Sequence, residues 1–289
     1  MKNNTHKLMK HILLPTDFSD NSWNAIIYAI KLFKNEDCTF HLLNTYTPAI
    51  YRLDYVIGYP EQFGLVDAVR NTSRRNLYDM VSRISSEFPK NGKHNFRTHA
   101  KFDTMVSGVR ESVDNLNIDL IVMGTKGATG AKEVLFGSNT VHVFKNIKCP
   151  ILAIPSGFEY EKPLEILFPT DLNVDYNRFQ IDILKHIVIT NTSRVNALHV
   201  SEGRDLSSKQ KNNQFALEAQ FKEGSYLFHH FKSMNVTTAI DTFQLKSKIN
   251  LLAMINNKHS FFENLFFKST VNQIGFNLPV PFLVIPSKH

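Results

Sequence analysis

Four glycines lie close together near the middle of the sequence, at Gly124, Gly127, Gly130 and Gly137. A short β-branched apolar run, Leu120 to Met123, precedes them, and apolar residues at helical spacing follow them from Ser138 to Asn146. Glycine allows positive φ and close approach of the backbone to a ligand, while the first N–H groups of a helix lack partners within the helix. A strand, a glycine-rich loop and a helix in this order therefore indicate a phosphate-binding site.

Polar residues follow the last of these glycines. Ser138, Asn139 and Thr140 would place free amides and two hydroxyls at the start of the helix, and Lys126 and Lys132 would add positive charge nearby. The alternative is an ordinary flexible connection between a strand and a helix. Because such a connection needs fewer glycines, we expect the loop to bind phosphate.

Three of the glycines follow the spacing Gly124-x2-Gly127-x9-Gly137-Ser138. This pattern resembles the G-2x-G-9x-G-(S/T) signature of the ATP-binding branch of the universal stress protein family. The signature is long and gapped, so a chance match is much rarer than for a short glycine motif. The resemblance implies that the loop binds ATP, with or without an accompanying Mg²⁺.

Two flanking segments agree with this resemblance. Leu13 to Ser19 is similar to the first strand and turn of the family, and Cys149 to Pro155 is similar to its last strand. The resemblance covers nearly the full chain but is sharp only in residues 10–19 and 119–155. The residues that it assigns to the nucleotide are Pro15, Thr16, Asp17, Thr45, Met123, Gly124, Lys126, Gly127, Gly137, Ser138, Asn139 and Thr140.

The resemblance also implies a part of the nucleotide for each residue. Met123 and Gly124 would lie under the ribose, and Lys126 and Gly127 would lie toward the phosphates. The residues from Gly137 to Thr140 would hold the phosphates themselves.

The base would lie at the other end of the site. Asp17 and the backbone of Thr45 would face the adenine, while Pro15 and Thr16 would line the nucleoside pocket. Asp17 also has a purely structural interpretation, because an Asp that precedes a helix is often its N-cap. The sequence leaves both interpretations of Asp17 open.

The composition is that of a water-soluble globular protein. The chain has 289 residues, of which 43% are hydrophobic and 20% charged, and no apolar run is long enough to cross a membrane. The N-terminal apolar run is too short for a signal peptide, and the two cysteines suggest reduced, buried packing residues. We therefore expect a cytoplasmic protein that does not bind membranes.

The net charge of +7 favours anionic ligands in a general way. The lysines and arginines are nevertheless scattered, and the one basic cluster, Arg70 to Arg75, is typical of a solvated helix face. We therefore expect no nucleic-acid partner.

Strand and helix patterns alternate along the first half of the chain. Strands are expected at residues 11–16, 39–46, 94–101, 118–123 and 150–154, and helices at 20–33, 66–88, 103–116 and 138–146. This alternation predicts a parallel sheet with helices on both faces. Thr47 to Gly64 has no clear period and predicts a long loop or lid.

The second half of the chain repeats the first. Leu164 to Leu172 matches Lys10 to Phe18, and Val280 to Pro286 matches Cys149 to Pro155. With the resemblance, this repeat predicts an α/β protein of two tandem five-stranded parallel-sheet domains that are Rossmann-like and similar to adenine nucleotide alpha hydrolases. Their predicted limits are residues 1–157 and 163–289.

The second copy is the shorter one and lacks the glycines. We expect it to have lost the lid and to have a third helix shortened around Phe243 to Ile249. Gly124, Gly127 and Gly137 correspond to Ile255, Lys258 and Lys268, whose side chains would fill the space for a triphosphate. We therefore predict a single nucleotide site, and leave open whether Lys258 and Lys268 bind another anion or are solvated, structural lysines.

The resemblance has consequences for assembly as well. Proteins of this kind pair through their last strands, so Ile151 to Ile154 and Phe282 to Ile285 would pair inside one chain as an intramolecular pseudo-dimer. A homodimer of such chains is a further expectation, and the protein partners are unknown.

Motifs for catalysis are missing from the sequence. It has no Walker, HRD, DFG, GxSxG or HExxH motif, and its histidines have no metal-ligand spacing. The predicted function is therefore an ATP-binding regulatory or protective protein of the stress response rather than an enzyme. The alternatives are a nucleotide-independent interaction protein with a vestigial loop and a slow ATP hydrolase.

Overall fold

The structure is a computed structural model that describes residues 9–46, 65–125, 136–176, 181–201, 203, 205–222, 224–256 and 279–286. Several predicted features lie outside these residues. They are the proposed lid at 47–64, most of the glycine loop, with Lys126, Gly127, Gly130 and Lys132, and the second-copy residues Lys258 and Lys268.

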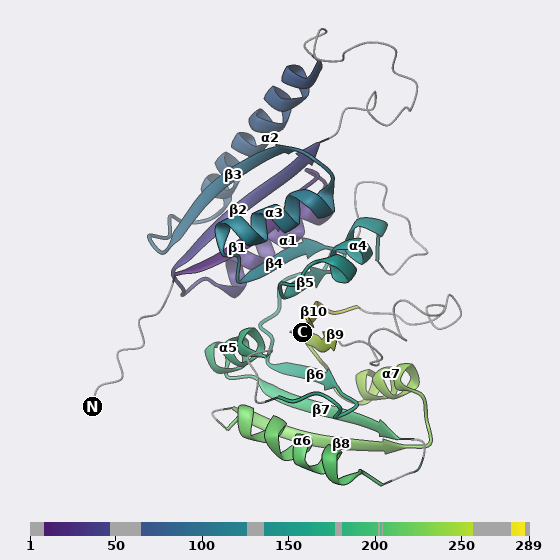
Figure 1. Cartoon of the computed structure of the whole chain (residues 1–289). Helices are drawn as coiled ribbons and strands as arrows, with labels where there is room; N and C mark the ends of the chain where they lie inside the picture. Colours follow the sequence, from purple (N-terminus) through teal and green to yellow (C-terminus); the bar gives the residue numbers. More distant parts are fainter. Residues whose placement is uncertain are drawn as a thin grey trace, which may run out of the picture. The chain divides into compact units, whose positions relative to one another are not determined.

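The described residues form an alternating series of strands and helices (Figure 1). The strands are β1 Lys10–Pro15, β2 Cys38–Tyr46, β3 His94–Phe102, β4 Leu120–Gly124, β5 Ile151–Ile154, β6 Glu165–Pro169, β7 Arg194–Ser201, β8 Ser225–Lys232, β9 Leu251–Asn256 and β10 Phe282–Pro286. The helices are α1 Asp20–Leu32, α2 Leu65–Glu87, α3 Met105–Leu116, α4 Ser138–Asn146, α5 Asp182–Asn191, α6 Ser208–Gln220 and α7 Val236–Lys246. The expected first-half elements are confirmed to within two residues at nearly every end.

The chain divides into two compact units. The first comprises residues 1–130 and 137–147, and the second comprises residues 131–136 and 148–289. Strand β5 of the first sequence copy thus belongs to the second unit. The predicted domain limits at residues 157 and 163 describe the sequence repeat and stay a prediction.

The sheet of the first unit has the strand order β3-β2-β1-β4. All three pairings are parallel, with β1 hydrogen-bonded to β2 on one side and to β4 on the other. Leu13, Leu14 and Ile121 are fully buried because helices cover both faces. Because both faces of the sheet are buried, β1 and β4 are continuous apolar runs in the sequence.

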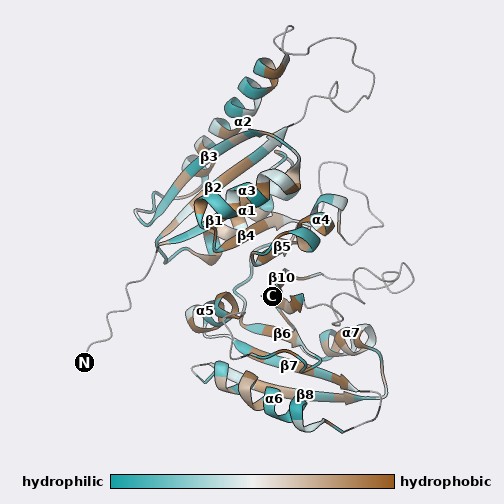
Figure 2. Cartoon of the chain, viewed as in Figure 1, coloured by the Kyte–Doolittle hydropathy of each residue, from teal (hydrophilic) through white to brown (hydrophobic). Residues whose placement is uncertain are grey.

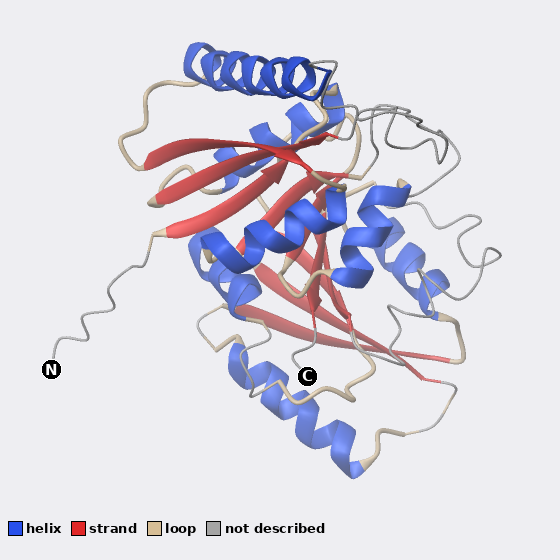
Figure 3. Cartoon of the chain, turned by 45° about the horizontal axis from the view of Figure 1, so that its top comes forward, coloured by secondary structure: helices blue, strands red, loops and turns tan. Residues whose placement is uncertain are grey.

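Two neighbouring residues of β2 show which helices cover each face. Asn44 accepts a hydrogen bond from Ser73 of α2, whereas Thr45 contacts Met105 of α3, and successive strand residues point to opposite faces. Helix α1 lies on the same face as α2, because Arg83 of α2 stacks on Trp23 of α1. In Figure 3 the long helix α2 runs along one side of the strands, and Figure 2 shows that it carries both hydrophilic and hydrophobic residues.

The sheet of the second unit has the order β5-β10-β9-β6-β7-β8. Its strands are parallel except that β5 runs antiparallel to β10, with Leu152 opposite Leu283 and Ile151 opposite Val284. The predicted pairing of the last strands of the two copies within one chain is thereby confirmed.

The prediction of a shortened third helix in the second copy is wrong. Helix α7 has 11 residues against 12 in its counterpart α3, because Ala239 and Ile240, upstream of the predicted segment, form a buried stripe with its first residue, Phe243. The shortening lies one helix earlier, where α6 has 13 residues against 23 in α2. The predicted loss of the lid agrees with the short connection of residues 202–207 between β7 and α6.

Other predictions concern single residues and chain properties. Cys38 and Cys149 are both buried, as expected, and do not form a disulfide with each other. Among the described residues, no helix combines the length and the apolar character that crossing a membrane requires.

A row of three histidines crosses the first sheet on the α3 side. His11 Nδ1 lies 3.0 Å from His41 Nε2, and His41 Nδ1 lies 3.0 Å from His99 Nε2. His41 is 1% exposed, and its burial, followed by the charges of His99, His11 and Arg97, lowers its pKa to about 4. The corresponding row of the second unit is Glu165, Asn196 and His229, joined by hydrogen bonds of 2.9 and 3.1 Å.

We therefore expect the first unit to lose stability in mild acid. Below pH 6.5 the unfolded chain protonates His41 while the folded chain does not, so the free energy of unfolding falls by about 1.4 kcal/mol per pH unit between pH 6.5 and pH 4 for this one group. Urea unfolding at several pH values, followed by Trp23 fluorescence, measures this slope. Trp23 is the single tryptophan and lies in α1, so it reports on the first unit.

The matched control is His41→Asn, which copies Asn196 of the second unit. It keeps a donor and an acceptor between His11 and His99 but cannot titrate. We expect its free energy of unfolding to fall less steeply as the pH decreases, by the contribution of one proton. Equal slopes for parent and variant would contradict the account.

Candidate functional site

The turn after β1 is held by its own side chains. Phe18 has a left-handed backbone with φ of 65°, and its N–H donates to Thr16 Oγ1 at 3.0 Å. The second unit repeats this turn, with Leu172 at φ 58° and its N–H donating to Thr170 Oγ1 at 3.0 Å. The Pro-Thr-Asp sequence therefore specifies a turn in both copies and does not by itself mark a ligand.

Asp17 is exposed at this turn and is not the N-cap of α1. The N-cap is Ser19, whose side chain accepts from the N–H of Ser22. One carboxylate oxygen of Asp17 accepts from the N–H of Ser19 at 3.1 Å and from its hydroxyl. The N-cap interpretation of Asp17 is therefore wrong, and its carboxylate is fixed at the mouth of the turn.

The end of β4 packs tightly against the start of α1. A Cβ on Gly124 would lie 2.5 Å from Asn21 Nδ2 and 3.1 Å from the Asn21 carbonyl oxygen. Met123, one residue earlier, is buried. The sequence assigned Gly124 to the ribose, but the structure gives it a packing role that the sequence could not show.

Helix α4 begins at Gly137, which is an N-cap without a side chain. Its φ of −63° and ψ of 157° are open to any residue, so the positive φ that glycines of this loop were expected to supply is not found at this position. Gly137 offers no side chain to cap the helix start, and Ser138 and Asn139 are exposed there. Within the described residues, the first amides of α4 therefore lack the side-chain oxygen that normally covers a helix start.

Thr140 and Gly137 attach this helix start to the end of β4. The buried hydroxyl of Thr140 donates to the carbonyl oxygens of Gly124 and Thr125, at 3.2 Å each, and the N–H of Gly137 donates to the Thr125 carbonyl oxygen at 2.8 Å. The hydroxyl of Thr140 is thus used for positioning the helix rather than for contact with a phosphate. Sequence reasoning missed this role, since Thr and Ser look alike at a helix start.

The parallel pairing of β1 with β2 and β4 brings the predicted residues together. Carboxyl ends of parallel strands meet at one edge of a sheet, where open α/β sheets bind ligands. Asp17 follows β1, Thr45 is half-buried near the end of β2, and Gly124 ends β4. Thr16 donates its N–H to the Leu43 carbonyl oxygen at 2.8 Å, which ties the first two strand ends together.

The equivalent place in the second unit is nearly filled. A cavity of only about 10 Å³ remains between the turn at Thr170 and Asp171 and the end of β9 at Met254 and Ile255. Tyr176 is 1% exposed there and is hydrogen-bonded to the hydroxyl of Thr170; its burial raises the pKa of the phenol well above the usual value.

Tyr176 occupies the sequence position that Ser22 has in the first copy, where Ser22 Oγ lies 2.9 Å from Thr16 Oγ1. One substitution thus keeps the hydrogen bond to the threonine and adds an aromatic ring that fills the pocket. Sequence reasoning found Ile255 at the position of Gly124 but missed Tyr176.

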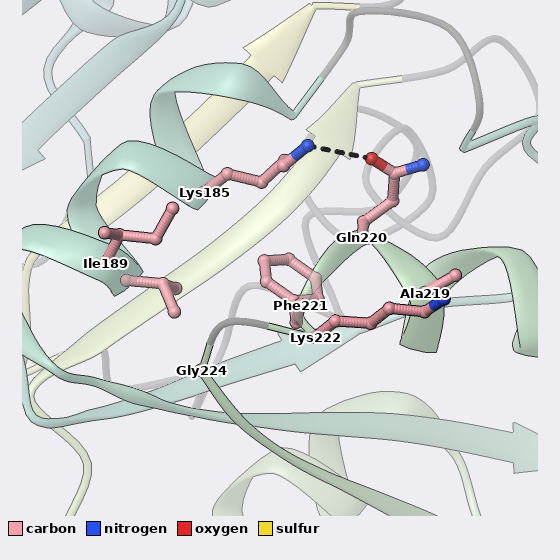
Figure 4. A pocket seen from close by; sticks show the side chains of 8 residues that line it. Lys185, Ile189, Ala219, Gln220, Phe221, Lys222 and Gly224 are labelled. Atoms are coloured by element: carbon pink, nitrogen blue, oxygen red, sulfur yellow. Dashed lines mark hydrogen bonds between the residues drawn. The ribbon is translucent and has the colours of Figure 1, made fainter. Parts of the chain in front are cut away.

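A larger cavity, of about 290 Å³, lies elsewhere in the second unit, between α5 and the end of α6 (Figure 4). Lys185 and Lys222 border it, Ile189 and Phe221 line it, and Lys185 Nζ donates to Gln220 Oε1 at 3.1 Å. None of the predicted nucleotide residues lines this cavity.

Comparison with known proteins decides the family. The family model described as "Universal stress protein family" matches residues 9–155, which is half of the chain. The chain belongs to the universal stress protein family. Universal stress protein MJ0531 of Methanocaldococcus jannaschii is 30% identical over 160 residues, which are 52% of this chain and 85% of that protein.

Two further universal stress proteins match the chain at lower sequence identity. Universal stress protein YxiE of Bacillus subtilis is 23% identical over 150 residues, 51% of this chain and 99% of that protein. The crystal structure of a universal stress protein from Archaeoglobus fulgidus DSM 4304 covers 96% of both chains with a TM-score of 0.67 at 18% identity. This last likeness extends the universal stress protein fold over both copies.

Substitution Gly124→Ala tests the tight contact between β4 and α1 in this universal stress protein. Because the new Cβ would meet backbone and side chain of Asn21, we expect the first unit to lose about 1–3 kcal/mol of unfolding free energy, as overpacked sites do. Urea unfolding followed by Trp23 fluorescence measures the loss. The control is Gly92→Ala, where the added Cβ meets nothing within 4 Å, and equal effects of the two substitutions would refute the account.

Proposed function

We propose that the first copy binds an adenine nucleotide, with ATP as the main ligand, and that the protein acts as a nucleotide-dependent regulatory or protective protein in the stress response. The observation that carries the proposal is the uncapped, exposed start of α4, tied by Thr140 and Gly137 to the end of β4. Asp17 lies at the end of the adjacent strand of the same sheet. The site thus offers groups for an anion and groups for a base.

The phosphates would bind at the start of α4. Backbone amides there carry partial positive charge, and Gly137 leaves them accessible because it has no side chain. Ser138 and Asn139 are exposed and can add side-chain hydrogen bonds. The sequence assigns Lys126 and Gly127 to the same end of the ligand.

The base would lie at the ends of β1 and β2. A carboxylate such as that of Asp17 accepts from the exocyclic amine of adenine, which a guanine does not present at the same position. The backbone of Thr45 and the buried turn of Pro15 and Thr16 would complete this end. Met123 and Gly124 would lie between the two ends, at the ribose.

A cation at this site would bind together with the nucleotide. Within the described parts of the chain, no three side chains of the metal-binding types converge on one point. A Mg²⁺ would therefore be held chiefly by the phosphates, as this ion often is in nucleotide sites. Binding rather than turnover is the proposed activity, and hydrolysis of ATP would show as phosphate release above that of a loop variant.

The second copy would serve as a structural partner. Its pocket is filled by Tyr176, while β10 pairs with β5 of the first copy. We propose one nucleotide site per chain, in the cytoplasm, and leave the protein partners and the assembly of whole chains as predictions of the sequence.

Equilibrium dialysis of the purified protein with labelled ATP tests the proposal. The variant Gly137→Val places a branched side chain over the first amides of α4, so we expect ATP affinity to fall at least about tenfold, the effect of losing roughly 1.4 kcal/mol of binding free energy. The matched control is Gly92→Val, in a turn of the same unit that no site residue touches. Failure of the parent to bind at millimolar ATP, or equal affinities of parent and Gly137→Val, would rule the proposal out.

A further inference from the structure

A buried chain of hydrogen bonds connects α2 with the turn after β1. The hydroxyl of Ser73 donates to Asn44 Oδ1 at 2.7 Å, and Asn44 Nδ2 donates to the carbonyl oxygen of Thr16 at 2.8 Å. The exposed fractions of the three residues are 4%, 8% and 6%. The first bond joins helix α2 to strand β2, and the second joins β2 to the turn that follows β1.

The same turn is held from its other side. Thr16 Oγ1 lies 2.9 Å from Ser22 Oγ and accepts from the N–H of Phe18 at 3.0 Å. Asp17 lies between Thr16 and Phe18, the two residues that these contacts fix. These contacts hold the backbone on both sides of Asp17, while its carboxylate is bonded to Ser19.

The direction of the two hydrogen bonds requires both Ser73 and Asn44. A carbonyl oxygen can only accept, so Asn44 must turn its amide nitrogen toward Thr16 and its oxygen toward Ser73. The Ser73 hydroxyl is the donor that the buried oxygen of Asn44 needs. Without it, the oxygen would be buried unsatisfied and the amide would be free to rotate away from Thr16.

In the second unit the corresponding turn is bonded to a helix directly: Gln210 Nε2 of α6 donates to the carbonyl oxygen of Asp171 at 3.0 Å, and Asn213 Nδ2 donates to that of Leu172 at 2.7 Å. There the carbonyl oxygen of Thr170 is bonded to His199 Nδ1 at 2.9 Å, and the ring of His199 packs on His230 of the neighbouring strand. His230 in turn contacts Ser201 at 2.9 Å. In both copies the turn is thus tied to the helix that follows the second strand, through Asn44 and Ser73 in the first copy and directly in the second.

We propose that Ser73 and Asn44 are positioning residues for base recognition: through Thr16, they fix Asp17 where it meets the adenine. This inference rests on the proposed nucleotide binding and assigns two residues that the glycine signature does not include. This series of hydrogen bonds ends at the turn after β1 and does not reach the start of α4. We therefore expect it to affect binding of the base and not binding of the phosphates.

The test compares two ligands. ATP has both a base and a phosphate chain, whereas inorganic tripolyphosphate has only the phosphate chain. We expect Ser73→Ala and Asn44→Asp to weaken ATP binding by about three- to tenfold, the factor that one lost hydrogen bond carries, and to leave tripolyphosphate binding within twofold of the parent. Asn44→Asp keeps an acceptor for Ser73 and replaces the donor to Thr16 by a carboxylate oxygen, which also adds a negative charge at a buried position.

The control variant is Ser112→Ala. Ser112 is fully buried in the same unit, and its hydroxyl donates only to the Gly108 carbonyl oxygen of its own helix at 2.7 Å. We expect it to leave the affinities for both ligands unchanged. Trp23 fluorescence confirms that each variant is folded during the titrations.

The outcomes separate the two proposals. Loss of ATP affinity with tripolyphosphate unchanged supports the positioning role. Equal losses for both ligands, or no loss for either, overturn the positioning role while ATP binding itself stands. A parent protein that binds neither ligand overturns the proposed function, and the positioning role with it.

Discussion

The site depends on the parallel pairing of β1 between β2 and β4. These hydrogen bonds lie in a sheet buried on both faces, so the register that pairs Ile12 with both Phe40 and Leu120 cannot slip without exposing apolar residues. As a consequence, three segments distant in sequence end at one edge. The turn at Asp17, the end of β2 and the end of β4 become neighbours before any ligand is present.

Two further constraints shape that edge. Asn21 of α1 approaches β4 so closely that only glycine fits at position 124, and Thr140 ties the start of α4 to the same strand end. The N-cap of α4 is then a residue without a side chain. The proposed phosphate end of the site is thus a helix start whose N-cap residue has no side chain and which the packing of its neighbours holds in place.

The two copies show how one fold carries a site in one place and fills it in another. Both copies keep the Pro-Thr-Asp turn with its left-handed fourth residue. In the second copy, Tyr176 replaces Ser22 and Ile255 replaces Gly124, and the cavity between them almost closes. What remains is a scaffold whose last strand pairs with that of the first copy.

Much of this could be predicted from the sequence, because the relevant signals are local. The apolar runs of β1 and β4, the helical spacing of α1 and α4 and the repeated Pro-Thr-Asp turn gave the fold and the candidate residues. Contacts between distant residues gave no local signal. The close approach of Asn21 to Gly124, the bonds of Thr140 to β4 and the link from Ser73 to Asn44 depend on packing that only the folded chain brings about. The shortening in the second copy was predicted one helix too late, although Gly224, a residue type that often follows a helix end, lies four residues after α6.

Counting the nucleotides bound to each chain tests the central claim most directly. Native mass spectrometry of the full-length protein with saturating ATP gives this number for each assembled species. The account predicts one ATP per polypeptide, bound in the copy that carries Gly137. Two per polypeptide, or none, would contradict it.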